Sequence, residues 1–295
     1  SHLIDRLIEK NEKVICLDDL SSGSLSNLNK VKSLNDFSFI NKNVVENLDL
    51  KVDRIWHFGS LASEKDYSKD PIKTMKNLFL GSMNLLNLAK NNKARILLAS
   101  SSEIYGESSM HSQDEKFYGN VNCFSQRASY SEGKRISETL FYNYHKMYGV
   151  DIRIARIFNT YGPRLSCKDS RVIGSFINNI ITNKFINIYG DGSQTRSFCY
   201  VDDTIQGLIS LMSSNFRKPI NLGNNSEISI LDLAILISKK IGNEVEFKFL
   251  DPKDEEPQKR NPSIALANKK LGWQPKIKLD IGLDMTIKYF LDNQR

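Results

Sequence analysis

The sequence lacks the features that mark several large classes of protein. No run of about 18 apolar residues is present, so we expect no membrane-spanning helix. The chain has few cysteines and only four histidines, and their spacing shows neither a Cys-x-x-Cys pair nor a metal-ligand pattern. The cysteines are Cys16, Cys123, Cys167 and Cys199. We therefore expect no metal site, and reduced thiols in a cytoplasmic protein.

A glycine-rich phosphate loop and an initiator methionine are also missing. The chain opens with helically spaced apolar residues over 3–8, and the apolar run at 14–17 indicates a strand that ends at Asp18 and Asp19. An acid at the end of the second strand of a dinucleotide-binding fold accepts hydrogen bonds from the adenosine ribose. We therefore expect a first strand and its glycine loop to precede Ser1. Without them, the chain as given should bind a dinucleotide poorly.

The composition is that of an ordinary globular protein. The 295 residues are 40% hydrophobic and 25% charged, and the formal net charge is +7. The positive charges are spread along the chain, which favours solvated lysine faces over nucleic-acid binding. A modest positive balance suits an anionic substrate. We expect a small anionic partner and no nucleic acid.

Strand and helix patterns alternate through the first half of the chain. Apolar runs predict strands at 14–17, 37–40, 53–58, 94–100 and 152–158. Helical spacing predicts long helices at 71–91 and 129–148. The alternation favours an α/β fold with a doubly wound parallel sheet of the Rossmann type.

Beyond residue 164 the pattern loosens into a smaller α/β lobe. Strand patterns occur at 185–189 and 244–250, and helical patterns occur at 172–182, 230–241 and 279–291. We expect a dinucleotide-binding domain over 1–164 and a substrate lobe over 165–295, with some segments of the lobe returning to the first domain. The predicted helix at 71–91 is apolar on more than one face, which makes it a candidate dimer surface.

Two Tyr-x-x-x-Lys pairs stand on the helix predicted at 129–148. A lysine one helical turn from a tyrosine can supply the cation that a phenol, with an ordinary pKa of about 10, needs to lose its proton near neutral pH. Tyr130 and Lys134 lie near the helix start, where the strand ends of a parallel sheet deliver ligands. Tyr142 and Lys146 lie about 18 Å further along the axis and cannot face the same site. We choose Tyr130 as the functional tyrosine and expect Tyr142 to be a packing residue.

Hydroxyl and carboxyl groups follow the apolar run at 96–99, which indicates a buried strand. The residues are Ser101, Ser102 and Glu103. At a strand end these groups can hold a substrate hydroxyl against a phenolate such as that of Tyr130. The combination predicts a nicotinamide-dependent enzyme that modifies a sugar.

Arginines mark two segments of the second half. Arg196 follows the turn-rich residues 189–194, and a guanidinium can clamp a diphosphate through two hydrogen bonds. A surface salt bridge is the alternative for Arg196. Arg260 lies in the charged loop 254–262, which is either a solvated linker or a segment that brings Arg260 to a substrate carboxylate or phosphate.

With these segments assembled, the chain resembles the extended short-chain dehydrogenase/reductase family of NAD-dependent epimerases and dehydratases. The resemblance runs from Ser1 to about Phe290. Its most specific matches are the segments 97–107, 130–135, 153–164, 188–201 and 257–264. The pair Ser102-Glu103 and the last two segments resemble the decarboxylases of the family more than its dehydratases.

The resemblance implies NAD-dependent decarboxylation of UDP-glucuronate to UDP-xylose through a 4-keto sugar. It implies that Tyr130, with Lys134 lowering its pKa, takes the proton of the sugar C4 hydroxyl, and that Ser101 hydrogen-bonds this hydroxyl. The implied catalytic set is completed, around the carboxylate and the enolate, by Ser102, Glu103 and Arg260. A nucleotide-sugar 4-epimerase or 4,6-dehydratase, and a non-catalytic truncated homologue, remain as alternatives.

The resemblance also implies binding residues and a homodimer. The residues implied for NAD are Asp18, Asp19, Ser22, Gly23, Val44, Phe58, Gly59, Ser60, Ser100, Tyr130 and Lys134. The residues implied for the UDP-sugar are Tyr67, Asn159, Arg164, Arg171, Tyr189, Gln194, Arg196 and Arg260. We expect the homodimer to form through the helices at 71–91 and 129–148.

Overall fold

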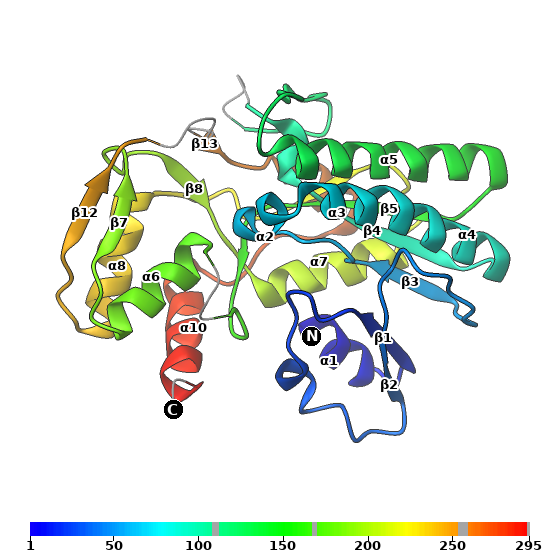
Figure 1. Cartoon of the computed structure of the whole chain (residues 1–295), viewed down its shortest axis with the longest axis horizontal. Helices are drawn as coiled ribbons and strands as arrows, with labels where there is room; N and C mark the ends of the chain where they lie inside the picture. Colours follow the sequence, from blue (N-terminus) through cyan, green and yellow to red (C-terminus); the bar gives the residue numbers. More distant parts are fainter. Residues whose placement is uncertain (108–111, 167–169, 253–258, 294–295) are drawn as a thin grey trace. The chain divides into compact units, whose positions relative to one another are not determined.

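The computed structural model describes residues 1–107, 112–166, 170–252 and 259–293 (Figure 1). Cys167 and residues 254–258 of the charged loop lie outside these described residues. The chain divides into two compact units. Unit 1 contains Ser1–Ile104, Asn122–Ala155 and Leu208–Pro219, and unit 2 contains Tyr105–Val121, Arg156–Gly207 and Ile220–Arg295. Each unit therefore collects segments that lie far apart in the sequence.

Unit 1 is built on parallel strands, as the alternating pattern predicted. Strand β4 (Arg95–Ser101) lies between β3 (Arg54–His57) and β5 (Ile152–Ile157), and its register with β3 sets Arg54 opposite Arg95. Strands β1 (Val14–Asp18) and β2 (Phe37–Asn41) form a second parallel pair. The predicted α/β class is thus confirmed, and the carboxyl ends of paired strands lie at the same edge.

The helices of unit 1 are α1 (His2–Ile8), the 3-10 turn η1 (Leu25–Leu28), α2 (Glu64–Lys69), α3 (Pro71–Lys76), α4 (Ser82–Asn92) and α5 (Ala128–Tyr148). A π-helical segment, η2 (Asn77–Gly81), joins α3 to α4. The prediction of one regular helix at 71–91 was therefore wrong at its centre. The Leu78 carbonyl in this wider segment accepts hydrogen bonds from the hydroxyls of Ser82 (2.5 Å) and Ser137 (2.9 Å).

The core of unit 1 packs α4 and α5 against the sheet. Leu86 of α4, Ile96 and Leu98 of β4, and Phe141 of α5 are fully buried in one cluster. Almost every residue of β4 is buried because both faces of a parallel sheet are covered, which explains its continuous apolar sequence. Helix α5 ends at Gly149, whose left-handed φ of 69° costs a glycine little.

Unit 2 contains short strands and longer helices. The strands are β6 (Thr160–Tyr161), β7 (Ile186–Tyr189), β8 (Thr195–Ser197), β9 (Cys199–Tyr200), β10 (Ile220–Leu222), β11 (Glu227–Ser229), β12 (Phe247–Leu250) and β13 (Lys259–Arg260). The helices are α6 (Val172–Ile181), α8 (Ile230–Ile241), α9 (Ala265–Leu271) and α10 (Leu279–Asn293). The strands predicted at 185–189 and 244–250 and all three predicted helices are confirmed, with small shifts at their ends.

Three elements pass from one unit to the other along the chain. Strand β5 leaves unit 1 after Ala155, the turn η3 (Ser102–Tyr105) begins in unit 1, and helix α7 (Val201–Ser213) begins in unit 2. Within unit 2, strand β8 lies between β11, which is antiparallel to it, and β13, which is parallel to it. Helices α6, α8 and α10 pack together through Ile177, Leu233 and Leu283, which are fully buried. In the described part of the chain, no helix has both the length and the apolar character to span a membrane.

Candidate functional site

Tyr130 and Lys134 lie in the first turns of α5, beside the carboxyl end of β4. Both side chains are buried. The Lys134 ammonium donates a 2.6 Å hydrogen bond to the carbonyl of Ala99 in β4 and lies 5.6 Å from the centroid of the Tyr130 ring. The helical spacing thus places a cation next to the phenol, in contact with the strand that delivers Ser101.

The pKa of the Lys134 ammonium is strongly shifted from its ordinary value. Burial lowers the pKa of its ammonium to about 7, and the nearby Glu138 carboxylate opposes the shift. Glu138 in turn accepts a 2.6 Å hydrogen bond from the hydroxyl of Ser100. Lys134 can therefore exchange a proton near neutral pH, which suits a residue that supports proton transfer.

A second tyrosine covers the ring of Tyr130. Tyr67 of α2 stacks on it, with a centroid distance of 5.1 Å and an interplanar angle of 8°. Tyr67 is buried in one cluster with Tyr130, Leu61 and Leu78. Tyr142, by contrast, is 56% exposed, so the expectation that it is a packing residue was wrong for this chain.

The turn after β4 carries the predicted hydroxyl and carboxyl groups. The Ser101 hydroxyl accepts a 3.2 Å hydrogen bond from the backbone N–H of Glu103, and Ser101 and Ser102 are both buried. The Glu103 carboxylate forms a 2.6 Å ion pair with Arg127, the residue just before α5. Sequence reasoning missed Arg127, because nothing in the spacing between residues 103 and 127 shows that they meet.

Loops that follow β1, β2 and β3 meet in unit 1. Asn43, after β2, donates a 2.7 Å hydrogen bond to Asp19, after β1. Burial opposes ionisation of Asp19, but hydrogen bonds from Ser21 and Asn43 prevail and lower the pKa of its carboxyl. A β-carbon at Gly59, after β3, would lie 3.3 Å from Val44, so the backbone passes close to that side chain.

The remaining residues expected at a dinucleotide lie in the same loops. Asp18 accepts a 2.8 Å hydrogen bond from the N–H of Leu20, and a β-carbon at Gly23 would lie 3.2 Å from its carboxylate. The Ser60 N–H donates to the Phe58 carbonyl at 2.7 Å. Carboxylates and close backbone at the carboxyl ends of parallel strands fit a dinucleotide that carries ribose hydroxyls.

A buried polar network lies under this site and was not predicted. His57 Nε2 and the hydroxyl of Ser137 on α5 each lie 3.1 Å from the hydroxyl of Ser82. Burial, with a smaller effect from the charge of Lys134, lowers the pKa of His57 to about 3. His57 is therefore a neutral structural side chain that joins β3 to the helix carrying Tyr130.

Unit 2 brings its two predicted arginines side by side. Arg196 of β8 and Arg260 of β13 are paired in the parallel register, so their side chains leave the same face of the sheet. Both are buried. The Glu227 carboxylate joins the strands that carry them, because it accepts hydrogen bonds from Thr195 (2.6 Å) and Asn261 (3.0 Å). Two neighbouring buried cations favour a ligand with anionic groups.

The other predicted substrate residues lie at the ends of unit 2 elements. Asn159 donates to the Ser197 carbonyl at 3.3 Å. Arg164 has a left-handed φ of 65°, and Arg171 directly precedes α6. Tyr189 ends β7, and its carbonyl accepts a 2.9 Å hydrogen bond from the side chain of Gln194.

Gln113 holds the segment that contains Arg260 and was not predicted. Its N–H donates to the Asn261 carbonyl at 2.9 Å, and its side-chain oxygen accepts from the Asn261 N–H at 2.8 Å. Its carbonyl accepts from the Ser263 N–H at 2.8 Å. Gln113 itself is buried, so one glutamine fixes the backbone on the carboxyl side of Arg260.

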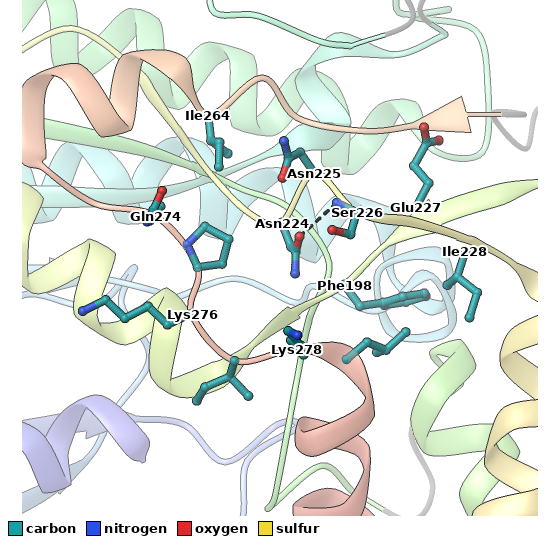
Figure 2. Close-up of a pocket in the computed structure, with 13 residues that line it drawn as sticks. Phe198, Asn224, Asn225, Ser226, Glu227, Ile228, Ile264, Gln274, Lys276 and Lys278 are labelled. Carbon is teal, nitrogen blue, oxygen red and sulfur yellow. Dashed lines mark hydrogen bonds between the residues drawn. The ribbon is translucent and has the colours of Figure 1, made fainter.

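Unit 2 also contains a cavity of about 530 Å³ (Figure 2). Phe198 and Glu227 contribute to its wall, and Lys276 and Lys278 border it from the segment before α10. None of the predicted site residues is among the described residues that line it. Glu227 is its connection to the arginine pair, through Thr195 and Asn261.

The parallel sheet, with a buried Tyr-x-x-x-Lys pair beside the end of β4, defines a dinucleotide-dependent enzyme class. The chain belongs to the NAD dependent epimerase/dehydratase family, which it matches over residues 1–223.

Its relatives include UDP-glucuronic acid decarboxylase 1 of Xenopus tropicalis, 44% identical over 290 residues that cover 98% of this chain and 69% of the relative. UDP-glucuronic acid decarboxylase 3 of Arabidopsis thaliana is 44% identical over 97% of this chain and 84% of its own length. Among solved structures, the UDP-glucuronic acid 4-epimerase from Bacillus cereus, in complex with UDP-glucuronic acid and NAD, matches with a TM-score of 0.89 and 26% identity. That match covers 99% of this chain and 95% of the epimerase.

Proposed function

We propose that the protein is an NAD-dependent decarboxylase that converts UDP-glucuronate to UDP-xylose. The observation that carries the proposal is the pairing of Arg196 with Arg260, because two buried cations side by side suit a substrate with both a diphosphate and a carboxylate. The similarity to curated UDP-glucuronic acid decarboxylases, at 44% identity over nearly the whole chain, supports this reaction over others in the family.

NAD fits the loops after β1, β2 and β3. Asp18 and Asp19 offer carboxylate acceptors for ribose hydroxyls, and Gly23 and Gly59 let the backbone pass close to Asp18 and Val44 in these loops. The chemistry that NAD supplies when bound is reversible hydride transfer at a sugar carbon.

Residues of unit 1 manage the proton of the sugar C4 hydroxyl. Tyr130 accepts that proton, and the Lys134 ammonium, held by the Ala99 carbonyl, stabilises the phenolate. The Ser101 hydroxyl hydrogen-bonds the sugar hydroxyl and orients it toward Tyr130. A ketone at C4 is β to the C6 carboxylate, so the bond to that carboxylate can break and leave its electrons on the ketone oxygen.

Four further residues interact with the carboxylate, the diphosphate and the enolate. Arg260 pairs with the carboxylate before it leaves as CO2, and Arg196 binds the diphosphate. Ser102 and Glu103 act at the enolate that remains. Asn159, Arg164, Arg171, Tyr189, Gln194 and Tyr67 stay predicted contacts of the UDP-sugar.

The test is to incubate the protein with NAD+ and UDP-glucuronate. We expect release of CO2 and formation of UDP-xylose. NMR of the sugar protons detects the product. The second candidate is a 4-epimerase, favoured by the match to the Bacillus cereus enzyme. Formation of the 4-epimer with all carbon retained would replace the decarboxylase proposal.

We also propose that the protein is a homodimer formed through α3, η2, α4 and α5. Exposed apolar side chains on these helices support it: Ile72, Met75, Phe79, Leu80, Ile136, Tyr142 and Met147. Clustered apolar residues on adjacent helices favour burial against a second copy of the chain. The cytoplasmic location stays a prediction.

A further inference from the structure

Arg127 occupies a central place among the charged groups of unit 1. Its guanidinium forms a 2.6 Å ion pair with Glu103 and a longer contact of 3.4 Å with Glu64 of α2. The Arg127 and Glu103 side chains are only 20% and 13% exposed, while Glu64 is 41% exposed. The inner pair is therefore shielded from solvent, and the outer contact is screened.

The same guanidinium joins three segments that carry site residues. Arg127 directly precedes α5, which holds Tyr130. Glu103 belongs to η3, at the end of the strand that delivers Ser101. Glu64 begins α2, and Tyr67 of that helix stacks on Tyr130. A shift of the Arg127 head would therefore disturb the carboxylate and the tyrosine together.

The charge of Arg127 is retained despite its burial. Burial opposes the cation, but the nearby acidic groups of Glu103, Tyr67 and Glu64 outweigh it and raise the pKa of the guanidinium. A permanent cation at hydrogen-bond distance favours the ionised form of a carboxyl group. It also offsets the repulsion that a second carboxylate, on a hexuronic acid, would meet near Glu103.

We propose that Arg127 is the positioning residue for Glu103: it holds that carboxylate in one orientation and in its ionised form for an anionic sugar. This role rests on the proposed function. The charged and titratable groups described around Glu103 in unit 1 are Arg127 and Arg135 from α5, and Glu64 and Tyr67 from α2. Arg135 donates to the neighbouring Ile104 carbonyl at 3.1 Å, and Arg127 is in direct contact with the Glu103 carboxylate.

The first experiment compares the pH dependence of CO2 release from UDP-glucuronate by wild type, Arg127→Gln, Arg127→Lys and Glu64→Gln. We expect Arg127→Gln to lower kcat about tenfold or more and to move the acidic limb of kcat/KM upward by about one pH unit. Arg127→Lys keeps the positive charge but loses the planar guanidinium that contacts both Glu103 and Glu64. We therefore expect kcat to fall while the acidic limb of kcat/KM stays at the same pH. Glu64→Gln, which removes only the outer partner, should change both values less than about twofold.

Two further variants keep the result interpretable if Arg127→Gln is poorly folded. In the Glu103→Gln background, Arg127→Gln should cost little more activity, because its partner is already neutral. Equal losses in both backgrounds would overturn the proposal. So would an acidic limb that is the same in wild type and in Arg127→Gln.

The second experiment separates this inference from the proposed function. Glutamate carboxyls are labelled with ¹³C, the Glu103 signal is assigned by its loss in Glu103→Gln, and its titration is followed by NMR in wild type and Arg127→Gln. A midpoint about one pH unit or more higher in Arg127→Gln supports the proposal; an unchanged midpoint refutes it. If wild type releases no CO2 from UDP-glucuronate, the proposed function fails, and this titration still decides the role of Arg127.

Discussion

At the scale of single residues, the site combines one perturbed lysine with two buried tyrosine rings. Lys134 has an ammonium whose pKa burial lowers to about 7, and its hydrogen bond to Ala99 fixes it beside Tyr130. The ring of Tyr67 stacks on the ring of Tyr130. The Tyr130 ring is thus held in place by a nearby cation and by stacking. Replacing Tyr130 by phenylalanine would keep the stacking and remove only the hydroxyl.

We predict that Tyr130→Phe abolishes turnover, by about a thousandfold or more, because the variant loses only the oxygen that accepts the proton. The ring still stacks on Tyr67, so folding and UDP binding should stay within about twofold of wild type. Steady-state rates and calorimetric titration with UDP measure the two effects. Substantial residual turnover would mean that another group takes the proton.

We predict that Lys134→Met stabilises the protein in a pH-dependent way. The ordinary lysine pKa of 10.5 falls to about 7 in the folded chain, so the folded state bears the full cost of the buried ammonium below pH 7. Between about pH 7 and 10.5 the unfolded state binds more protons, and the stability of wild type rises with pH. The variant should therefore be more stable by about 2 kcal/mol at pH 6.

Urea unfolding at several pH values measures this difference for Lys134→Met. The advantage of the variant should shrink as the pH rises through the window from 7 to 10.5. Lys146→Met on the same helix is the matched control, since its ammonium lies over the exposed ring of Tyr142. An advantage that stays constant with pH would contradict the assignment.

The sequence allowed prediction of residues whose chemistry depends on local spacing. Tyr130 and Lys134 were found because a helix places residues four apart on one face. Arg127 was not found, since its partner Glu103 stands 24 positions away and only the fold brings them together. The same reason hid Gln113, whose hydrogen bonds reach residues 261 and 263.

At the scale of elements, the π-helical segment η2 is matched to α5. A β-carbon placed on Gly133 would lie 2.4 Å from Cδ1 of Leu78 and 3.1 Å from its Cβ. The two elements can approach this closely only because Gly133 has no side chain. Ser137 then reaches the Leu78 carbonyl, which the wider turn makes available.

We predict that Gly133→Ala lowers the free energy of unfolding by about 1–3 kcal/mol and slows turnover, because α5 must move and Lys134 moves with it. Leu78→Ala leaves a cavity and is destabilising by itself. The double variant should nevertheless be more stable than the sum of the two losses implies, since the clash is gone. Denaturant unfolding of all four proteins measures the coupling, and strict additivity would contradict the packing argument.

We predict that Gln113→Ala lowers the rate of CO2 release about tenfold. The change leaves the buried N–H of Asn261 without its acceptor, and Arg260 stands directly beside it. Gln113→Glu keeps an oxygen at this position and should lose less. Measuring both variants with and without Arg260→Ala shows whether Gln113 acts through the arginine: its effect should nearly vanish once the arginine is absent.

Elements with long amphipathic patterns were predictable, whereas strands of two or three residues were not. Helix α8 and helix α5 match their predicted ranges closely because their apolar stripes repeat over several turns. In the described part of the chain, strand β13 consists of Lys259 and Arg260, which pair with β8. No local pattern reveals such a partner, so this sheet and its arginine pair became apparent only in the folded chain.

At the scale of the whole molecule, arginine hydrogen bonds to backbone carbonyls tie a distant segment to the sheet of unit 1. Arg153 on β5 donates to the Ser214 carbonyl at 2.9 Å, and Arg95 on β4 donates to the Met212 carbonyl at 2.7 Å. Asp151 accepts from both arginines, and despite partial burial these bonds lower the pKa of its carboxyl to about 2. The bonds to the two carbonyls connect residues of the segment Leu208–Pro219 to the rest of unit 1.

We predict that the protein sediments as a dimer and that Met75→Glu or Tyr142→Glu shifts it to a monomer. Met75 on α3 and Tyr142 on α5 are 47% and 56% exposed, and a charge in an apolar interface is costly to bury. Phe249→Glu on β12, where the native side chain is 58% exposed, should leave the assembly unchanged. Analytical ultracentrifugation measures the masses, and a monomeric wild type would contradict the proposed interface.

The pairing of Arg196 with Arg260 on neighbouring strands affects the choice of buffer. Sulfate and inorganic phosphate are small polyanions, and paired arginines attract such ions whether or not a sugar is attached. Added to the solvent, they should raise the melting temperature above that found in chloride, because they bind the folded chain. They should also compete with UDP-linked compounds, so Michaelis constants obtained in phosphate buffer will exceed those obtained in a zwitterionic one.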